Sequence, residues 1–332
     1  MSKKITKILI ANRGEIALRI IRACKEFEIT SVVIHSEVDS EGPWVKKADK
    51  SVLLEGHPVE VYLDYENIIK IAKDLKCTAI HPGYGFLSEN ADFATACADN
   101  QLIFIGPSAE CIAASGNKSA ARKTLMAAGI AIIPGSEDII SSPQEAFEIA
   151  AQVGYPVILK ASGGGGGRGM RIAYDQNELA DAIAVASGEA RAAFGNPDLY
   201  LEKYIEKPRH IEIQILGDHF GNYIHLGERE CSIQMRYQKL IEESPSPFVD
   251  EDLRNKLGET AIQVARLVEY TNAGTMEFLV DKSKNYYFME VNARVQVEHP
   301  VTELVTGIDI VQQQILLAQG EPLALKQDDV QL

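Results

Sequence analysis

The stretch EVNARVQVE, residues 290–298, places five polar side chains on one face and four apolar ones on the other. A period of two over nine residues is typical of a β-strand. Hard divalent cations prefer carboxylate and amide oxygens, a guanidinium suits a planar oxyanion, and a carboxylate can act as a general base. A solvated strand face is the alternative interpretation. The five polar residues are Glu290, Asn292, Arg294, Gln296 and Glu298.

A second predicted strand, residues 275–280 (TMEFLV), precedes this stretch and is joined to it by the turn formers DKSKN. If the two strands form a hairpin, Glu277 lies directly opposite Glu290. Two carboxylates that face each other across a sheet repel, unless a divalent cation lies between them. The hairpin therefore predicts a metal site made of Glu277, Glu290 and Asn292.

Five consecutive glycines, residues 163–167, lie between two predicted strands and are followed by Arg168 and Gly169. The backbone N–H groups of such a run can wrap a phosphate, and Lys160 and Arg168 supply positive charge beside it. A floppy hairpin tip is the alternative, and no P-loop sequence is present. Lys118 and Lys239 resemble solvated or surface-paired lysines on local evidence. With the opposed carboxylates, the glycine flap predicts an ATP-dependent ligase or phosphotransferase.

The N-terminal part predicts an α/β domain with a parallel sheet. A strand at 7–11, a helix at 15–28 and a strand at 31–35 form a βαβ opening, without a GxGxxG dinucleotide fingerprint. The loop HPGYGFLSEN, residues 81–90, follows a strand, where ligands sit in open α/β sheets. The later chain is α+β. The predicted segments are an N-terminal domain at 1–115, a helical linker at 116–133, a small lid module at 134–206 and a strand-rich core at 207–332.

Composition excludes several classes of protein. The 332 residues carry a formal net charge of −14, which argues against binding to nucleic acid or to an anionic membrane. No apolar run reaches the roughly 18 residues that a membrane span needs. The five cysteines form no CxxC pair, so we expect neither a zinc site nor a disulfide framework. A reducing cytoplasm is the expected setting, with buried structural cysteines favoured over a catalytic thiol.

The chain resembles the biotin carboxylase subunit or domain of the biotin-dependent carboxylases, an ATP-grasp family. The matching segments are KILIANRGEIALRIIRACKE, AIHPGYGFLSEN, FIGP, YPVILKASGGGGGRGMR, EKYIEKPRHIEIQI, GTMEF and MEVNARVQVEHPVTE. The resemblance implies a Rossmann-like pre-ATP-grasp domain, a lid and a mainly antiparallel ATP-grasp core. It implies that ATP and bicarbonate form carboxyphosphate, with Mg²⁺ or Mn²⁺, and that N1 of biotin on a carboxyl carrier protein is then carboxylated. A carboxyltransferase partner for acetyl-CoA, propionyl-CoA or pyruvate, and a homodimer, are implied as well.

The resemblance also assigns roles to individual residues. Glu298 takes the proton of bicarbonate, Arg294 supports the developing charge, and Lys239 completes the catalytic set. Bicarbonate is surrounded by Lys239, Arg294, Gln296, Val297 and Glu298, and the metals are held by Glu277, Glu290 and Asn292. The implied ATP contacts are Lys118, Lys160, Gly166, Gly167, Glu202, Lys203, Ile205, His210, Tyr237 and Glu277.

Two departures from the family pattern stand out. Tyr237 occupies a position where the family usually has His beside the nucleotide. The family also continues past the position of Leu332 with an ECRINAE-type motif, whose Arg is associated with the biotin enolate, and these 332 residues contain no such motif. A non-catalytic or incomplete ATP-binding fragment is therefore the alternative function. Another ATP-grasp ligase, of the carbamoyl-phosphate or purine-pathway type, is disfavoured by HPGYGFLSEN together with EVNARVQVEHP.

Overall fold

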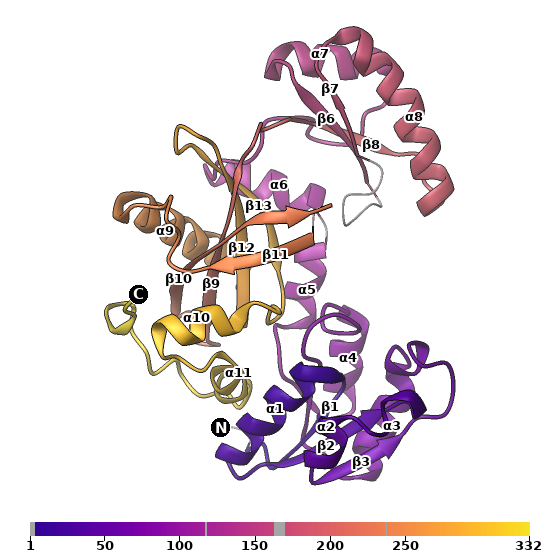
Figure 1. The fold of residues 1–332 in the computed structure, drawn as a ribbon, viewed down its shortest axis with the longest axis vertical. Helices are drawn as coiled ribbons and strands as arrows, with labels where there is room; N and C mark the ends of the chain where they lie inside the picture. The colour runs from indigo at the N-terminus through magenta and orange to yellow at the C-terminus, as the bar shows by residue number, and fades with distance from the viewer. Residues whose placement is uncertain (1–3, 117, 163–169, 237) are drawn as a thin grey trace.

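Three β-sheets succeed one another along the long axis of the computed structural model, which describes residues 4–116, 118–162, 170–236 and 238–332 (Figure 1). The N-terminal domain lies at one end, the small module at the other, and the largest sheet between them. Within these ranges, no helix combines the length and the apolar character needed to cross a membrane. The arrangement confirms the predicted combination of a parallel α/β domain with later antiparallel sheets.

The N-terminal sheet is parallel, with strand order β3-β2-β1-β4-β5. Alternate residues of β1 enter different cores, because successive side chains of a strand point to opposite faces. Ile8 packs in a cluster with α1, whereas Leu9 packs with α3 and α4. Helices therefore cover both faces. The elements are β1 (Lys7–Ile10), α1 (Gly14–Glu26), β2 (Thr30–His35), η1 (Glu37–Asp39), α2 (Pro43–Lys47), β3 (Lys50–Leu53), η2 (Glu60–Tyr62), α3 (Tyr65–Asp74), β4 (Ala79–His81), α4 (Ala91–Asp99) and β5 (Ile103–Phe104).

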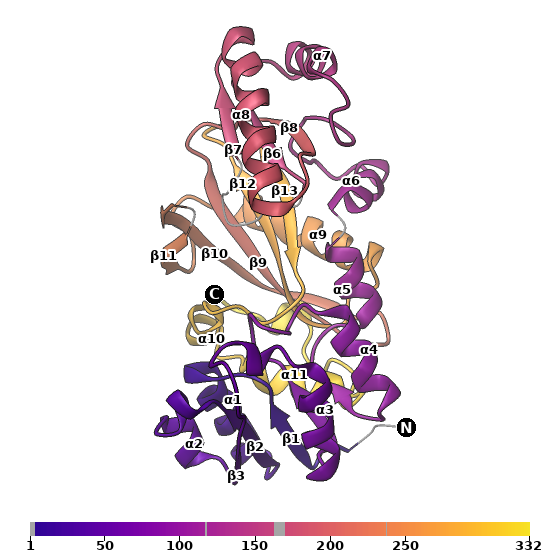
Figure 2. The ribbon, with the colours of Figure 1, turned by 90° about the vertical axis from the view of Figure 1, so that its right-hand side faces the viewer.

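Two helices, α5 (Ala109–Gly116) and α6 (Lys118–Ala127), run along one side of the molecule from the N-terminal domain toward the small module (Figure 2). The chain then passes close over the small module. A Cβ on Gly135 would lie 2.2 Å from the carbonyl oxygen of Leu201, so only glycine fits there. Gly135 bridges to Glu202, and the Ser136 N–H donates to Leu201 O at 2.7 Å. The linker thus ends as an added edge of the module's sheet.

The small module is a three-stranded antiparallel sheet, ordered β7-β6-β8, with two helices packed against it. Its elements are α7 (Pro143–Val153), β6 (Val157–Ala161), β7 (Met170–Ala173), α8 (Gln176–Phe194) and β8 (Leu199–Lys203). Ser142 caps α7 by accepting from the Glu145 N–H, and Gly154 ends it as expected. The glycine run that joins β6 to β7 lies outside the described residues.

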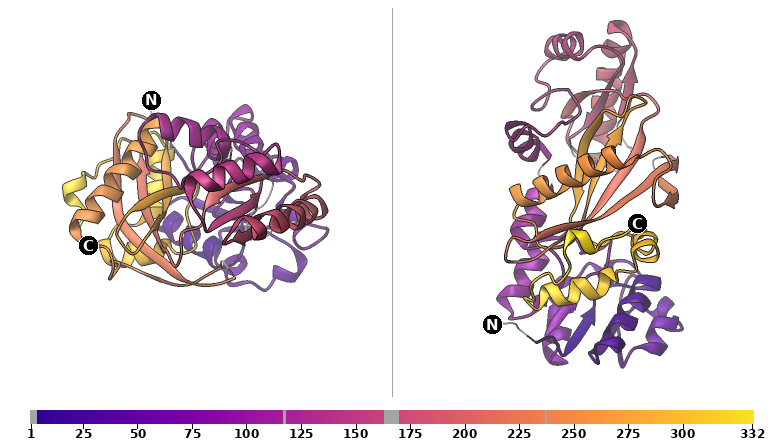
Figure 3. Two further views of the ribbon diagram at one scale, coloured as in Figure 1. Left: turned by 90° about the horizontal axis from the view of Figure 1, so that it is seen from above. Right: turned by 90° about the vertical axis from the view of Figure 1, so that its left-hand side faces the viewer.

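The central sheet is antiparallel, with strand order β11-β10-β9-β12-β13. Helix α9 lies across one face, while α10 and α11 lie between the sheet and the N-terminal domain (Figure 3). Ile310 and Ile315 of α11 share one hydrophobic core with Ile16 and Ile20 of α1. The elements are β9 (Arg209–Gly217), β10 (Tyr223–Met235), β11 (Gln238–Glu243), α9 (Glu251–Leu267), β12 (Asn272–Val280), β13 (Tyr286–Asn292), α10 (His299–Thr306), α11 (Ile310–Ala318) and η3 (Gln327–Asp329).

One expectation about this sheet was wrong. The alternating stretch 290–298 is not one strand, because β13 ends at Asn292 and α10 begins at His299. The Ala293 N–H donates to a carboxylate of the N-terminal domain, Glu89 Oε1, at 3.0 Å rather than to a neighbouring strand.

His81 lies at the end of β4, fully buried where the N-terminal domain meets the later chain. Its Nδ1 accepts from the Gly83 N–H at 3.1 Å. Burial, together with the nearby charges of Arg19 and His299, lowers the pKa of His81 to about 3. The imidazole is therefore neutral in the folded protein at any mildly acidic pH.

We expect His81→Asn to reduce the acid sensitivity of folding. An unfolded His takes up its proton near pH 6.5, whereas folded His81 does so only near 3. The unfolded state binds more protons in that interval, so the free energy of unfolding falls as the pH falls, with a contribution of about 1.4 kcal/mol per pH unit. Asn keeps an acceptor for Gly83 but does not titrate. Urea denaturation across this interval should give a shallower slope for the variant, and equal slopes would contradict the assignment.

Candidate functional site

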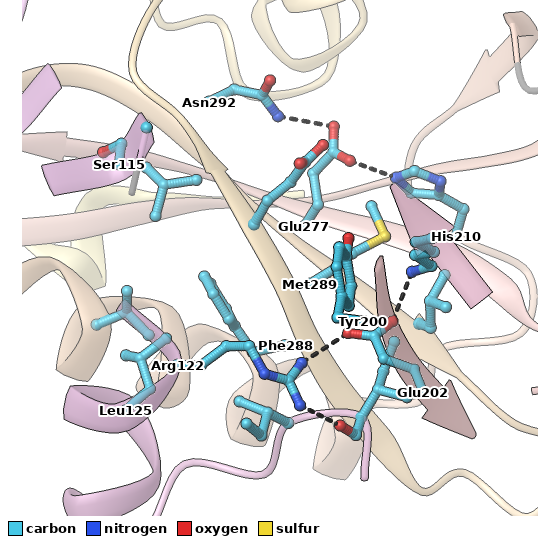
Figure 4. A pocket seen from close by; sticks show the side chains of 18 of the residues that line it. Ser115, Arg122, Leu125, Tyr200, Glu202, His210, Glu277, Phe288, Met289 and Asn292 are labelled. Carbon is cyan, nitrogen blue, oxygen red and sulfur yellow. Dashed lines mark hydrogen bonds and ion pairs between the residues drawn. The ribbon is translucent and has the colours of Figure 1, made fainter. Parts of the chain in front are cut away.

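A cavity of about 1940 Å³ lies between the central sheet, the small module and helix α6 (Figure 4). It exceeds the roughly 300–1,000 Å³ of an ordinary small-molecule pocket. The cavity has room for a nucleotide beside a second substrate. Thirteen predicted site residues line it: Lys160, Glu202, Lys203, Ile205, His210, Lys239, Glu277, Glu290, Asn292, Arg294, Gln296, Val297 and Glu298.

The remaining predicted site residues cannot be placed as side chains. Gly166, Gly167 and Tyr237 lie outside the described residues. Lys118 is the first residue of α6, but its side chain is likewise outside the description. Their expected contacts with ATP stay predictions.

Glu277 and Glu290 face each other across the β12–β13 ladder, as the hairpin argument predicted. A register shift follows immediately, between Glu277 and Phe278, so the pairing holds from this point toward Asn292. Glu277 is only 4% exposed, and its Oε2 accepts from His210 Nε2 at 2.8 Å. Its Oε1 accepts from Lys239 Nζ, Asn292 Nδ2 and Gln296 Nε2 at 3.0, 2.8 and 3.1 Å.

The oxygen atoms around this pair fit a hard divalent cation. The carboxylates of Glu277 and Glu290 are cross-strand neighbours on one face, and both residues line the cavity. Asn292 turns its amide nitrogen toward Glu277 and its Oδ1 toward Arg294 Nη2, at 3.0 Å. Ligands of this type suit Mg²⁺ or Mn²⁺. The metal role of these three residues nevertheless stays a prediction.

A buried ammonium holds the carboxylates together behind this pair. The Nζ of Lys239 donates to Glu277 at 3.0 Å, to Glu298 at 2.6 Å and to Glu212. The side chain of Lys239 is only 20% exposed. Burial lowers the pKa of Lys239, but the charges of the three carboxylates outweigh burial and raise that pKa. Lys239 is therefore a permanent cation here and not the surface lysine of the local interpretation.

Glu298 is a deprotonated carboxylate at neutral pH. Burial alone would raise the pKa of Glu298, but the charge and the hydrogen bond of Lys239 lower it below its ordinary value. Glu298 precedes the first residue of α10, so that its backbone is fixed by a helix start. A proton acceptor is thus placed at one end of the cavity.

Arg229 and Glu212 form an ion pair that sequence reasoning missed. Arg229 is fully buried, and its Nε donates to Glu212 Oε1 at 2.5 Å. The same guanidinium donates to Gln296 Oε1 at 2.7 Å and so orients a predicted bicarbonate residue. The sequence of β9 contains a pattern that could have identified Glu212, because this residue lies on the same alternating polar face as His210 and Gln214. Further Arg229 donors go to Gln214, Thr302 and Thr275.

Two clusters of possible metal ligands lie near Lys239, with ligand atoms within 4.8 Å of one another. One contains His210, Glu212 and Glu277, and the other contains Glu212, Cys231 and Glu298. Both share carboxylates with the ammonium of Lys239. These carboxylates are already paired with Lys239, with Arg229 at Glu212 and with His210 at Glu277, so neither cluster by itself indicates a metal site.

Arg294 is anchored by the N-terminal domain. Its Nε donates to Glu89 Oε2 at 3.0 Å, while Glu89 Oε1 accepts from the Ala293 N–H. Glu89 belongs to the loop HPGYGFLSEN, which sequence analysis placed at a ligand-binding edge without naming this residue. The loop thus contributes by holding a cavity residue in place.

Glu202 and Lys203 mark the other end of the cavity, under the small module. Glu202 accepts from Lys160 Nζ at 2.5 Å and from Arg122 Nη1 at 2.6 Å. Arg122, in α6, was not predicted. Lys203, a predicted ATP contact, donates through its Nζ to the carbonyl oxygens of Gly154 and Tyr155 in the small module, at 3.0 and 2.7 Å.

The five cysteines are all free and buried. Burial raises the pKa of Cys77 to about 11 and that of Cys24, Cys97 and Cys111 to about 12, and it raises the pKa of Cys231 as well. Because the thiolate is the reactive form, these thiols are poor nucleophiles. The buried positions of all five cysteines agree with the structural role that the sequence analysis favoured over a catalytic thiol.

Comparison with known proteins agrees with this geometry. The family model described as "Biotin carboxylase, N-terminal domain" matches residues 4–112, and "Carbamoyl-phosphate synthase L chain, ATP binding domain" matches residues 117–326. A biotin carboxylase from Nostoc sp. is 55% identical over 331 residues, which cover 99% of this chain and 74% of the relative. The chain belongs to the biotin carboxylase family.

Solved biotin carboxylase structures have the same fold. A biotin carboxylase from Campylobacter jejuni, in a complex described as β-γ-ATP, is 48% identical with a TM-score of 0.94 and covers 99% of this chain and 74% of that one. The biotin carboxylase domain dimer of the 2-oxoglutarate carboxylase from Hydrogenobacter thermophilus, in complex with MgADP, ADP and bicarbonate, is 48% identical with a TM-score of 0.92, covering 99% and 72%.

We expect Lys239→Met to destabilise the fold by about 3–5 kcal/mol at neutral pH, since it leaves buried carboxylates without their cation. Burial, no longer opposed by Lys239, would then raise the pKa of Glu298. In the wild type the contribution of Glu298, whose pKa is lowered, is present above its ordinary pKa of 4.5 and is lost as the pH falls below it. The variant instead regains stability on acidification toward about pH 5.5, because its carboxylates become protonated.

Urea denaturation of both proteins at about pH 8 and about pH 5.5 measures this difference. The exposed i,i+4 pair of Lys256 with Asp252 offers a matched control, Lys256→Met, which should change stability little at either pH. A destabilisation by Lys239→Met that is the same at both pH values would contradict the buried-cation account.

Proposed function

We propose that this biotin carboxylase family chain forms carboxyphosphate from ATP and bicarbonate and transfers the carboxyl group to N1 of biotin, with inorganic phosphate as the leaving group and acceptor of the N1 proton. The observation that carries the proposal is the shared cavity. One end holds Lys160 and Glu202, the middle holds the opposed carboxylates, and the other end holds Arg294 and Glu298. The related domain from H. thermophilus, crystallised with MgADP and bicarbonate, supports the same pair of ligands.

The nucleotide is proposed to lie between the small module and the central sheet. Lys160 in β6 and His210 at the start of β9 both line the cavity, and His210 is directed toward Glu277 (Figure 4). A bound Mg²⁺ or Mn²⁺ would supply positive charge against the phosphates of ATP. Glu277, Glu290 and Asn292 are the residues that would hold it. Their placement on two hydrogen-bonded strands fixes their spacing before any ligand enters.

Bicarbonate is proposed to bind at the Arg294 end. A bicarbonate oxygen attacks the γ-phosphorus, the bond from phosphorus to the bridging oxygen breaks, and ADP leaves with that electron pair. Glu298 accepts the bicarbonate proton, which becomes more acidic as the adjacent oxygen bonds to phosphorus. Arg294, held by Glu89, stabilises the negative charge of the oxyanion. Gln296, fixed by Arg229, and Val297 complete this end of the cavity.

The proposed partners follow from the carboxyl transfer. Biotin would arrive on a carboxyl carrier protein, and a carboxyltransferase would pass the carboxyl group to an acyl-CoA or a 2-oxo acid. A homodimer is proposed because the H. thermophilus relative is described as a domain dimer. Free, buried cysteines support a reducing compartment, for which the cytoplasm is our proposal.

ADP release with Mg²⁺, ATP and bicarbonate, with and without free biotin, tests this function. Release that rises with biotin is the expected result. Release that requires bicarbonate but ignores biotin would restrict the function to the carboxyphosphate step. The absence of bicarbonate-dependent release from folded protein would contradict the proposal and favour the non-catalytic alternative.

Replacing the proposed base should separate catalysis from binding. Glu298→Gln keeps the shape of the side chain but cannot accept the proton, so bicarbonate-dependent ADP release should fall by about 10²-fold or more. The Kd of MgATP, measured by calorimetry, should change little. The exposed Glu259→Gln in α9 is the matched control and should retain full activity. Retained turnover in Glu298→Gln would rule out its role as the base.

Replacing one of the opposed carboxylates tests the metal site. Glu290→Gln removes a charge that faces Glu277 and should raise the Mg²⁺ concentration needed for nucleotide binding, by roughly tenfold or more. Calorimetric titration of ATP at several Mg²⁺ concentrations measures the effect. An unchanged Mg²⁺ dependence would refute the argument from opposed carboxylates.

A further inference from the structure

Arg122 reaches the cavity from helix α6, outside every motif that sequence analysis singled out. It lies in the second turn of this helix. Its Nη1 donates to Glu202 Oε1 at 2.6 Å, and its Nη2 donates to the Ile133 carbonyl oxygen at 2.9 Å (Figure 4). The guanidinium therefore ties α6, the end of the linker and strand β8 together at one wall of the cavity.

Glu202 is the carboxylate of this contact, and it is held by two cations at once. Its Oε1 binds Arg122, while its Oε2 accepts from Lys160 Nζ at 2.5 Å. Its side chain is only 6% exposed, and Arg122 and Lys160 are 18% and 22% exposed. The backbone of Glu202 is fixed as well, because Gly135 bridges to it across the edge of β8. Glu202 cannot move out to water without disrupting this edge.

The proposed nucleotide site makes a second demand on Lys160. To bind a phosphate of ATP, the ammonium of Lys160 has to turn its N–H groups away from Glu202 and toward the nucleotide. If Lys160 were the sole cation near Glu202, this change would leave a buried carboxylate without a counter-ion, which is strongly unfavourable. Arg122 removes the difficulty, because the Arg122–Glu202 pair stays neutral and hydrogen-bonded after Lys160 turns away.

We propose that Arg122 is a positioning residue of the nucleotide site, and that it acts as the standing counter-ion of Glu202 that releases Lys160 to a phosphate of bound ATP. The inference rests on the proposed function. Arg122 touches neither reacting atom in this account. Its contribution to ATP binding passes through Glu202 and depends on the negative charge there.

The test is a double-mutant cycle on the Kd of MgATP, measured by calorimetry with the full chain. Arg122→Leu alone should weaken binding by about tenfold to a hundredfold, because Lys160 is then retained by Glu202. In a Glu202→Gln background the same substitution should have almost no effect, because a neutral amide needs no counter-ion. Arg122→Lys should restore most of the affinity in the wild-type background, since it keeps the positive charge.

Arg171→Leu is the matched control, because Arg171 forms an exposed ion pair with Glu189 in the same module, away from the cavity. It removes the same charge and should leave the Kd unchanged. Equal weakening by Arg122→Leu with and without Glu202→Gln would overturn the counter-ion role, as would no weakening at all. If Arg122→Leu does not fold, the comparison of Arg122→Gln in both backgrounds decides in the same way.

Failure of this inference is distinguishable from failure of the proposed function. A wild-type chain that binds no MgATP would contradict the proposed function itself. A wild-type chain that binds MgATP and releases ADP, with an Arg122→Leu variant of equal affinity, would leave the proposed function intact and overturn the role of Arg122 alone.

Discussion

The ammonium of Lys239 is the interaction on which the site depends. It lies among Glu212, Glu277 and Glu298, which come from β9, β12 and the start of α10. Three carboxylates so close together would repel, and burial would protonate some of them. One buried cation keeps them charged and near one another, so that the same contact positions the proposed base and one of the proposed metal ligands. The β10–β11 hairpin that carries Lys239 is therefore part of the proposed active site.

Rigid pairing and shared packing place the rest of the cavity around this cation. Strands β9, β12 and β13 of the central sheet fix by register the residues that are proposed to lie beneath the nucleotide. The small module joins the core through β8 and the added edge at Gly135. Helix α11 packs against both α1 and β12, so the N-terminal domain and the core share hydrophobic residues. The cavity is thus a property of the whole chain and not of one sheet.

Sequence reasoning succeeded where local periodicity and register decide the structure. The opposition of Glu277 and Glu290 needed only a hairpin of the expected length, and the ladder has that pairing. It failed where long-range contacts decide. Strand β13 stops at Asn292 because Ala293 donates to Glu89, about 200 residues earlier in the chain, and no local pattern contains that partner. Arg122 was missed for the same reason, since it is defined by a carboxylate on a distant strand. Arg229 differs, because its partner Glu212 lies directly opposite it in the β9–β10 hairpin.

Glu89 has a consequence for how this architecture can be altered. It binds both the backbone and the side chain at the Ala293–Arg294 corner, although it belongs to the N-terminal domain. In a chimera that joins this ATP-grasp core to the N-terminal domain of a relative, the donor domain would supply the residue that positions Arg294, the proposed bicarbonate-binding arginine. A recombination point between residues 90 and 290 consequently separates Glu89 from the Ala293 N–H and the Arg294 side chain that it binds.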